Sequence, residues 1–314
     1  MHLHTTKSIG ALRVSPLALG GNVFGWTADE AQSFAVLDAY VEAGGNFIDT
    51  ADVYSVWVEG HVGGESESII GRWMTVRKNR SQIVVASKVG AHPQLKGLSA
   101  ATISKAVDAS LKRLRTDYLD LYYTHVDDET VDVSEFLTAL HSLVAAGKVR
   151  ELGTSNISPS RLEEALAFCE HESMTRYSVI QPHYNLMARD LYEGRLADVV
   201  SQHGLVAVPY FALAKGFLTG KYRRGEHVES ARSRQAARYL DTPRGQRVLT
   251  ALDDIAAAHC VDQAAVALAW LAAQPTVVAP LASARTVEQL QAQLHFRELT
   301  LSEDELDALT AASA

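Results

Sequence analysis

The stretch Asn46-Phe47-Ile48-Asp49-Thr50-Ala51-Asp52-Val53-Tyr54 decides the fold of this chain. A short apolar run ends in the acid Asp49, and Tyr54 follows five residues later. Two later apolar runs also end in ionisable residues, because 83–87 leads into Lys88 and 118–124 leads into His125. Short apolar runs of this kind are typical of buried strands. An acid, a tyrosine, a lysine and a histidine at the ends of three successive runs predict one site built on one scaffold.

Strand-like and helix-like segments alternate along the whole chain around this stretch. The runs that we expect to form strands are 16–20, 46–49, 83–88, 118–125, 149–155, 177–181, 205–210 and 277–281. The expected helices are 29–43, 65–74, 100–114, 133–146, 159–171, 191–203, 245–259, 262–273, 287–295 and 302–312. Eight strand–helix units without an interior linker predict a single α/β domain over 1–314, a (β/α)8 TIM barrel with parallel strands. A turn at Gly10 predicts an N-terminal hairpin, and the last helices are additions to the barrel.

The alternative for this alternation is an open, doubly wound sheet. Such a sheet usually carries a glycine-rich phosphate turn after its first strand. The first turn, 20–25, reads GGNVFG and lacks the G-x-G-x-x-G spacing, and GFLTGKY at 216–222 is not a P-loop. The alternation breaks only at 211–243, after the seventh run. This long segment, rich in arginine, is either a surface loop or a flap that closes over a cofactor or substrate.

Composition restricts the class of protein. With 314 residues, 47% of them hydrophobic, the chain can bury a large core, and its formal net charge of -8 argues against nucleic acid or an anionic membrane as a partner. The apolar stretch near 264–273 is too short to cross a bilayer, and the N-terminus lacks the pattern of a signal peptide. Two distant cysteines, Cys169 and Cys260, favour a reducing cytoplasm. The histidines lack metal-ligand spacing, so we expect no metal site. A monomer is the default, with an oligomer left open.

Polar residues follow the expected strands at the end where a barrel of this type carries its active site. Strand ends often meet solvent, so any one of these residues is weak evidence by itself. In strand order they are Asp49 with Tyr54, Lys88, His125, Ser155 with Asn156, Gln181, Tyr210, and Ser283 with Arg285. Together they supply a proton donor, charged groups beside it, and amides.

The first three strand ends suit proton transfer. A free tyrosine has a pKa near 10 and is a poor acid at neutral pH, but a buried ammonium stabilises the phenolate and lowers that pKa. Lys88 can supply the ammonium, and the Asp49 carboxylate would keep Lys88 charged. His125 would donate a hydrogen bond to a substrate oxygen. This set predicts proton transfer from Tyr54 to an oxygen that gains negative charge.

These residues resemble the catalytic tetrad of the aldo-keto reductase superfamily, and the resemblance covers essentially the whole chain. The family's Asp-x-Ala-x-x-Tyr segment appears at 49–54, its Gly-x-Ser-Asn segment at 153–156, and its strand-six glutamine as Gln181. The resemblance implies a bacterial-type oxidoreductase that reduces an aldehyde or ketone to an alcohol with a nicotinamide cofactor, usually NADPH. It implies that hydride passes to the carbonyl carbon while Tyr54 protonates the oxygen.

The resemblance also implies a set of cofactor contacts. Ser155, Asn156 and Gln181 would hold the carboxamide, Tyr210 would stack under the nicotinamide, and 213–222 would lie along the pyrophosphate. The other implied contacts are Leu213, Gly216, Lys221, Ser283, Arg285, Gln289 and Gln293.

The phosphate end departs from the best-known members of that family. Ser283 stands near the position of their lysine, Gln289 near a usual arginine, and Gln293 where many have the asparagine that reads adenine. Arg285 remains, and its guanidinium can pair with a 2′-phosphate. NADP(H) is therefore the expected cofactor, with dual use of NAD(H) as the alternative.

Aromatic residues after the first two strands would line an apolar pocket for a small-molecule carbonyl substrate, although each could instead pack a loop. They are Phe24, Trp26 and Trp57. Two other functions stay open. One is a nicotinamide-binding regulatory subunit. The other is a barrel lyase that uses Lys88 as a Schiff-base amine, which leaves Tyr54 and the amides without a role.

Overall fold

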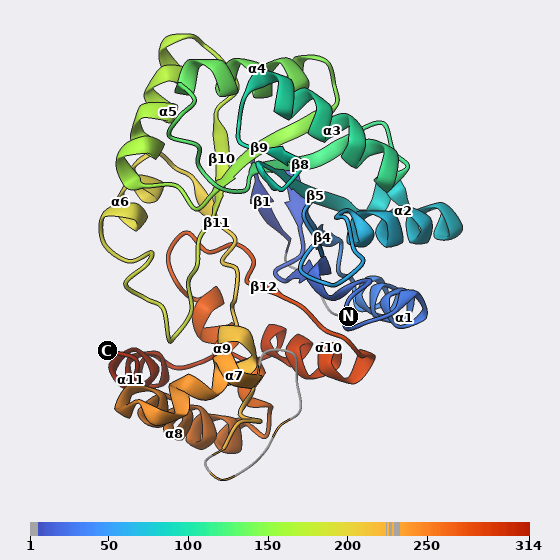
Figure 1. The fold of residues 1–314 in the computed structure, drawn as a ribbon. Helices are drawn as coiled ribbons and strands as arrows, with labels where there is room; N and C mark the ends of the chain where they lie inside the picture. The colour runs from blue at the N-terminus through green and yellow to red at the C-terminus, as the bar shows by residue number, and fades with distance from the viewer. Residues whose placement is uncertain (1–5, 224, 226–227, 229–232) are drawn as a thin grey trace.

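Eight parallel strands form a curled sheet at the centre of the computed structural model, which describes residues 6–223, 225, 228 and 233–314 (Figure 1). In spatial order they are β11 (Val206–Ala207), β10 (Tyr177–Gln181), β9 (Val149–Ser155), β8 (Leu119–Thr124), β5 (Val84–Val89), β4 (Phe47–Asp49), β3 (Ala18–Gly20) and β12 (Leu281–Ala282). A parallel bridge between Ala207 and Val277 joins the two edges, with the Ala207 amide 2.8 Å from the carbonyl oxygen of Thr276. The fold is the predicted (β/α)8 barrel.

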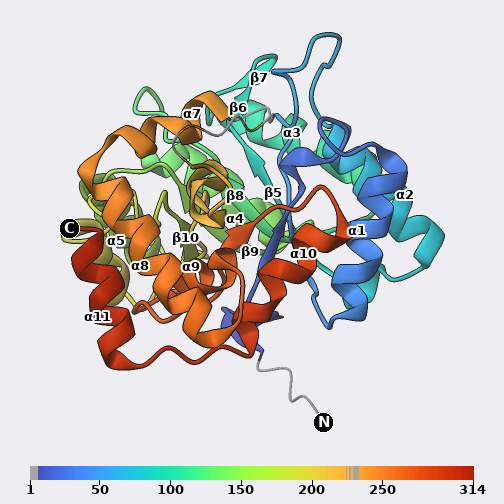
Figure 2. The same ribbon diagram turned by 90° about the horizontal axis from the view of Figure 1, so that it is seen from below.

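Helices alternate with the strands and cover the outer face of the sheet, as the two views of the ribbon show (Figure 2). They are α1 (Glu30–Glu42), α2 (Glu65–Arg77), α3 (Ala100–Leu114), α4 (Val133–Ala145), α5 (Pro159–His171), α6 (Arg195–Gln202), α8 (Pro243–His259), α9 (Gln263–Ala272), α10 (Val287–Leu294) and α11 (Glu303–Ala312). The side chains of Ser99, Asp132 and Ser158 cap the first turns of α3, α4 and α5. Such caps satisfy amides that the helix itself leaves unpaired.

An antiparallel hairpin closes one end of the barrel. It consists of β1 (Lys7–Ile9) and β2 (Leu12–Val14), which meet at the expected Gly10 turn. Its buried side chains belong to the same apolar cluster as the inward-facing residues of the strands, including Phe47 and Val208. The opposite end, where the strands finish, stays available for a site.

The seventh and eighth strands differ most in length from the prediction. The seventh was expected over 205–210 and the eighth over 277–281, whereas β11 covers two residues and β12 begins at Leu281. Pro209 and Pro280 lie in these runs, and proline has no N–H to donate to a ladder. α6 begins at Arg195, four residues later than expected, after a turn in which Gly194 has a φ of +87°. A small antiparallel pair, β6 (Ala91–His92) with β7 (Leu95–Lys96), was not expected.

The segment after β11 contains short helices and a part outside the described residues. Its described elements are η3 (Ala214–Thr219), α7 (Ser233–Ala237) and η4 (Arg238–Asp241). Arg224 and Arg232, two arginines of the segment expected to be a surface loop or a flap, lie outside the described residues. Other single turns are η1 (Gly21–Val23), η2 (Arg80–Gln82) and η5 (His295–Arg297). In the described ranges no single helix is long and apolar enough to cross a membrane, and one pair bent by 100°, α8 with α9, meets that test by length and composition only.

Candidate active site

A cavity of about 520 Å³ opens at the carboxyl end of the barrel strands. Sixteen of the residues predicted for the site contribute to its wall, from elements spread over the whole chain. They are Trp26, Asp49, Tyr54, Trp57, His125, Ser155, Asn156, Gln181, Tyr210, Leu213, Gly216, Lys221, Ser283, Arg285, Gln289 and Gln293. The fold therefore brings the expected catalytic, cofactor and pocket residues to one place.

The expectation that Phe24 lines the pocket is wrong. Its side chain is fully buried in the hydrophobic core and does not line the cavity. The chain turns tightly after β3, with the Gly25 amide donating to the carbonyl oxygen of Ala28 over 2.8 Å. Within this turn Phe24 packs inward while Trp26 lies on the cavity wall. The sequence could not distinguish the two, because both follow the same strand end.

Lys88 lies beneath the cavity wall, fully buried. Its Nζ donates to Oδ1 of Asp49 over 2.5 Å and to the carbonyl oxygen of Thr50 over 2.7 Å, and it lies 5.2 Å from the centre of the Tyr54 ring. Burial alone would lower the pKa of Lys88, but the Asp49 carboxylate and the Tyr54 oxygen outweigh it, so this pKa stands above its ordinary value. The ammonium is therefore charged at neutral pH, beside the ring that it can tune.

His125 is held as a neutral imidazole near Tyr54. The two rings are 6.0 Å apart at an angle of 77°. Burial, and then the charge of Lys88, lower the pKa of His125 to about 3. Its Nδ1 has no hydrogen-bond partner among the described residues. A neutral imidazole has one donor and one acceptor nitrogen, so His125 can donate a hydrogen bond to a substrate oxygen without adding charge to the site.

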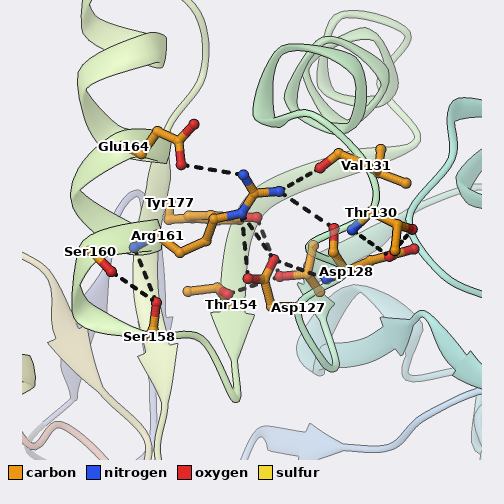
Figure 3. Close-up of polar contacts among 11 residues, drawn as sticks. Asp127, Asp128, Thr130, Val131, Thr154, Ser158, Ser160, Arg161, Glu164 and Tyr177 are labelled. Atoms are coloured by element: carbon orange, nitrogen blue, oxygen red, sulfur yellow. Dashed lines mark hydrogen bonds and ion pairs between the residues drawn. The ribbon is translucent and has the colours of Figure 1, made fainter.

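The loop that follows His125 is fastened to α5 by Arg161. Figure 3 shows the guanidinium pointing from the helix into this loop. It donates to the carbonyl oxygen of Val131 over 2.5 Å and of Asp128 over 3.4 Å, and it pairs with the Asp127 carboxylate at 3.4 Å. Arg161 and Asp127 are both largely buried, so these contacts are poorly screened by water. They hold the chain just beyond His125 in one conformation.

The amide and hydroxyl groups next to Asp49, Tyr54, Lys88 and His125 form hydrogen bonds with one another. Tyr210 donates from its hydroxyl to Oδ1 of Asn156 over 2.9 Å, and its ring stacks on His183 at 5.2 Å. Ser155 donates to the carbonyl oxygen of Gln181 over 2.7 Å. A flat aromatic surface beside preset amides fits the nicotinamide group that the sequence implies.

The far end of the cavity offers a buried acceptor. The Gln293 side chain is 5% exposed, its Nε2 donates to the carbonyl oxygen of Ser283 over 3.0 Å, and its Oε1 has no partner among the described residues. An unpaired buried oxygen is unfavourable unless a ligand supplies a donor, and an adenine amino group would do so. Gln289 accepts from the Arg285 amide over 3.0 Å, and within the described ranges no carboxylate pairs with the Arg285 guanidinium. These residues fit a dinucleotide.

Some cavity residues were missed from the sequence. Asn22 accepts a hydrogen bond from Ser283 over 2.5 Å and so links the loops after β3 and β12, while Asp262 lines the wall. The signal for Asn22 was its place two residues after a strand end, in a turn that was considered only for its glycine spacing. In the part of the chain that the structure describes, no group of three or more histidine, cysteine or acidic side chains could hold a metal ion.

Comparison with known proteins gives a consistent result over nearly the whole chain. Residues 16–314 match the model of the Aldo/keto reductase family. Norsolorinic acid reductase of Emericella nidulans is 33% identical over 316 residues, covering 95% of this chain and 78% of the relative. Protein Tas of Escherichia coli is 33% identical over 329 residues, covering 96% of this chain and 94% of the relative. The aldo-keto reductase AusK of Aspergillus calidoustus is 33% identical over 323 residues, covering 95% and 78%.

Proposed function

Since this chain belongs to the aldo/keto reductase family and is an oxidoreductase, we propose that it reduces an aldehyde or ketone to an alcohol with NADP(H), with Tyr54 as the proton donor. The observation that carries the proposal is the arrangement around Tyr54. The Nζ of a charged, buried Lys88 lies 5.2 Å from the centre of its ring, and the ring centre of a neutral His125 lies 6.0 Å away, at the wall of a cavity large enough for a substrate.

Each tetrad residue has one task in this proposal. Tyr54 gives its proton to the substrate oxygen, and the Lys88 ammonium stabilises the phenolate left behind. Asp49 keeps Lys88 protonated through the 2.5 Å contact between its Oδ1 and the lysine Nζ. His125 donates a hydrogen bond to the same substrate oxygen and so orients the substrate carbonyl group toward Tyr54.

The cofactor would lie along the cavity from Tyr210 to Gln293. When bound, a nicotinamide supplies the hydride. Ser155, Asn156 and Gln181 would hold the carboxamide of the nicotinamide. Because Gln181 Nε2 already donates to Oδ2 of Asp49 over 2.8 Å, the side-chain carbonyl oxygen of Gln181 would accept from the carboxamide nitrogen. The other contacts that we propose are Leu213, Gly216, Lys221, Ser283, Arg285 and Gln289, all of which line the cavity. Arg285 would bind the 2′-phosphate, with dual use of NAD(H) as the alternative.

The substrate would enter beside two tryptophans. Trp26 and Trp57 meet edge to face at 5.6 Å, and Trp57 meets Tyr54 at 5.7 Å. Aromatic walls next to the proton donor support an apolar carbonyl compound as the substrate. The Emericella nidulans relative is a norsolorinic acid reductase by name.

The two other functions considered are less well supported. A Schiff-base lysine must lose its proton and reach the substrate. Lys88 is fully buried, is paired with Asp49 and does not line the cavity. A regulatory subunit would not need the ordered group around Tyr54. Both cysteines are free in the structure, Cys169 buried and Cys260 exposed, which suits the reducing cytoplasm that we propose for this enzyme. We also propose that it acts as a monomer on a small molecule.

The test is a fluorescence titration with NADPH and with NADH, followed by an absorbance screen of aldehydes, ketones and keto-sugars at the nicotinamide band. We expect binding of NADPH and its consumption with at least one aromatic aldehyde, such as nitrobenzaldehyde. Absence of binding by either nucleotide would overturn the proposed function. Binding without turnover would favour the regulatory subunit.

A further inference from the structure

The carboxylate of Glu65, the first residue of α2, accepts hydrogen bonds from backbone amides of the loop before the helix. Oε1 accepts from the Val62 amide over 2.9 Å and from the Gly63 amide over 3.2 Å. Oε2 accepts from the Ser55 amide over 3.1 Å and also lies 3.1 Å from the Gly63 amide. One side chain therefore holds both ends of the loop 55–63. An acid in a first helical turn is favourable for its own helix, but these contacts reach the loop that precedes the helix.

This loop directly follows the proposed proton donor and carries part of the pocket wall. It begins directly after Tyr54, whose carbonyl oxygen accepts from the Gly64 amide over 2.9 Å, and it contains Trp57. Trp57 is 48% exposed, which is unusual for so large an apolar side chain, and it contacts the rings of both Tyr54 and Trp26. The hydrogen bonds that Glu65 accepts therefore support the loop that bears Trp57.

Glu65 also lies against the other tryptophan loop. A Cβ placed on Gly25 would be 3.2 Å from the Cβ of Glu65, so the turn that carries Trp26 packs directly on this residue. Gly25 has a φ of +76°, a backbone conformation that favours glycine. Because glycine has no Cβ, the turn can also approach α2 closely. One side chain therefore supports the two loops that present Trp26 and Trp57 to the cavity.

We propose that Glu65 is a positioning residue that sets the place of Tyr54 relative to the Trp26–Trp57 wall, and so couples substrate fit to proton transfer. The inference rests on the proposed reductase function. Two observations make a carboxylate necessary. It accepts from three amides with two oxygens, and an amide side chain offers only one acceptor oxygen. Burial by itself would raise the pKa of Glu65, but the amide hydrogen bonds outweigh it and lower that pKa, so the group is ionised at neutral pH.

The variant that tests this is Glu65→Gln, with Glu30→Gln as its matched control. Glu30 is also the first residue of a helix, α1, and it pairs with Arg72 at 2.8 Å, outside the cavity. Both changes remove a first-turn charge, and only the first removes support from the loop. We expect Glu65→Gln to lower kcat/KM for nitrobenzaldehyde by about tenfold or more, while the Kd for NADPH stays within about twofold. Glu30→Gln should leave both unchanged.

A spectroscopic signal separates positioning from general stability. The edge-to-face pair of Trp26 and Trp57 should give a near-UV circular dichroism band, which Trp57→Phe assigns. We expect Glu65→Gln to lose this band below its melting temperature and Glu30→Gln to keep it. If Glu65→Gln does not fold, Glu65→Asp, which keeps the charge but withdraws it by one methylene, is measured instead.

Retention of both the band and wild-type kcat/KM in the Glu65 variant would overturn the inference. So would loss of the band with unchanged kcat/KM, since positioning would then not matter to the reaction. If the wild-type protein reduces no carbonyl compound, the proposed function fails, and retention or loss of the band still decides whether Glu65 positions the aromatic wall.

Discussion

Gln181 donates a hydrogen bond from Nε2 to Oδ2 of Asp49, 2.8 Å away, across the end of the barrel. The two residues lie on β10 and β4, with β9, β8 and β5 between them in the sheet. The other oxygen of Asp49 accepts from Lys88. The residue that we propose for the carboxamide and the pair that we propose to tune Tyr54 therefore form one buried network. Since such networks respond as a unit, disturbance at either end should be felt at the other.

Asp49→Asn should shift the pH dependence of the reaction. Removal of the carboxylate leaves burial as the main influence on Lys88, so the pKa of Lys88 should fall from its raised value. The ammonium would then be lost at lower pH, and the alkaline limb of the kcat/KM profile should move toward neutrality. At pH 7 we expect a loss of about tenfold to a hundredfold, or roughly 1.4–2.7 kcal/mol. The exposed Asp117→Asn is the control, and coincident profiles of Asp49→Asn and wild type would contradict the tuning role.

Tyr54→Phe should abolish reduction and leave cofactor binding intact. The change removes the proton donor but keeps a ring of the same shape against Trp57 and His125. Single-turnover absorbance measurements give the rate, and fluorescence quenching gives the Kd for NADPH. A rate within about tenfold of wild type, a loss of under roughly 1.4 kcal/mol, would mean that another group supplies the proton.

Arg285→Ala should weaken NADPH binding much more than NADH binding. Arg285 lines the cavity near Gln293, and among the described side chains no carboxylate neutralises its guanidinium. A charge-assisted contact to a 2′-phosphate is lost in the variant, whereas NADH has no such group. Paired titrations at one ionic strength measure the two dissociation constants. Equal increases in both would exclude the phosphate role, and Gln289→Ala serves to separate loss of charge from disturbance of the Arg285 backbone.

Most of the barrel could be predicted because its central elements are long and strongly patterned. β9, β10, α3 and α5 begin and end at the predicted residues. The ends of the seventh and eighth strands could not be predicted. An apolar run does not show how many of its amides form hydrogen bonds with the neighbouring strand when the run contains a proline. The closure between the two edges depends on the bridge between Ala207 and Val277, which is a long-range contact.

The site was predictable as a set of residues and not as a set of contacts. Side-chain chemistry and order along the chain indicated Asp49, Tyr54, Lys88 and His125. The direction of Phe24 and the linkage of Gln181 to Asp49 depend on tertiary packing across the barrel. The sequence did not indicate the role of Glu65, because its hydrogen-bond donors are backbone amides. Every residue except proline has such an amide, so the sequence pattern does not reveal which ones Glu65 contacts.

NADPH should protect the segment 211–243 from trypsin if this segment closes over the cofactor. Phe211, Leu213, Gly216, Lys221 and Tyr222 all line the cavity, so a dinucleotide would contact the first third of the segment. Cutting should slow when NADPH is added and should be unaffected by adenosine alone. Mass spectrometry of the fragments measures the effect. Equal cutting rates with and without NADPH would favour the surface-loop interpretation.

Asp52→Asn should stabilise the protein at alkaline pH and much less at acid pH. Asp52 is fully buried and, within the described ranges, neither of its oxygens has a hydrogen-bond partner of regular geometry. Burial, reinforced by the Glu67 carboxylate and opposed by Arg113, raises its pKa from 3.8 to about 7. The folded protein therefore keeps a proton that the unfolded chain has lost above pH 4, and stability falls as the pH rises from about 4 to about 7.

The amide in Asp52→Asn does not titrate, so this decline should be absent from the variant. Three pKa units correspond to about 4 kcal/mol, which is an upper bound because the surroundings relax around the charge. Thermal unfolding at pH 5 and at pH 8 measures the difference, with the exposed Asp254→Asn as control. We expect the Tm of Asp52→Asn to exceed that of wild type by several degrees more at pH 8 than at pH 5. Parallel curves for the two proteins would show that Asp52 is already ionised in the folded state.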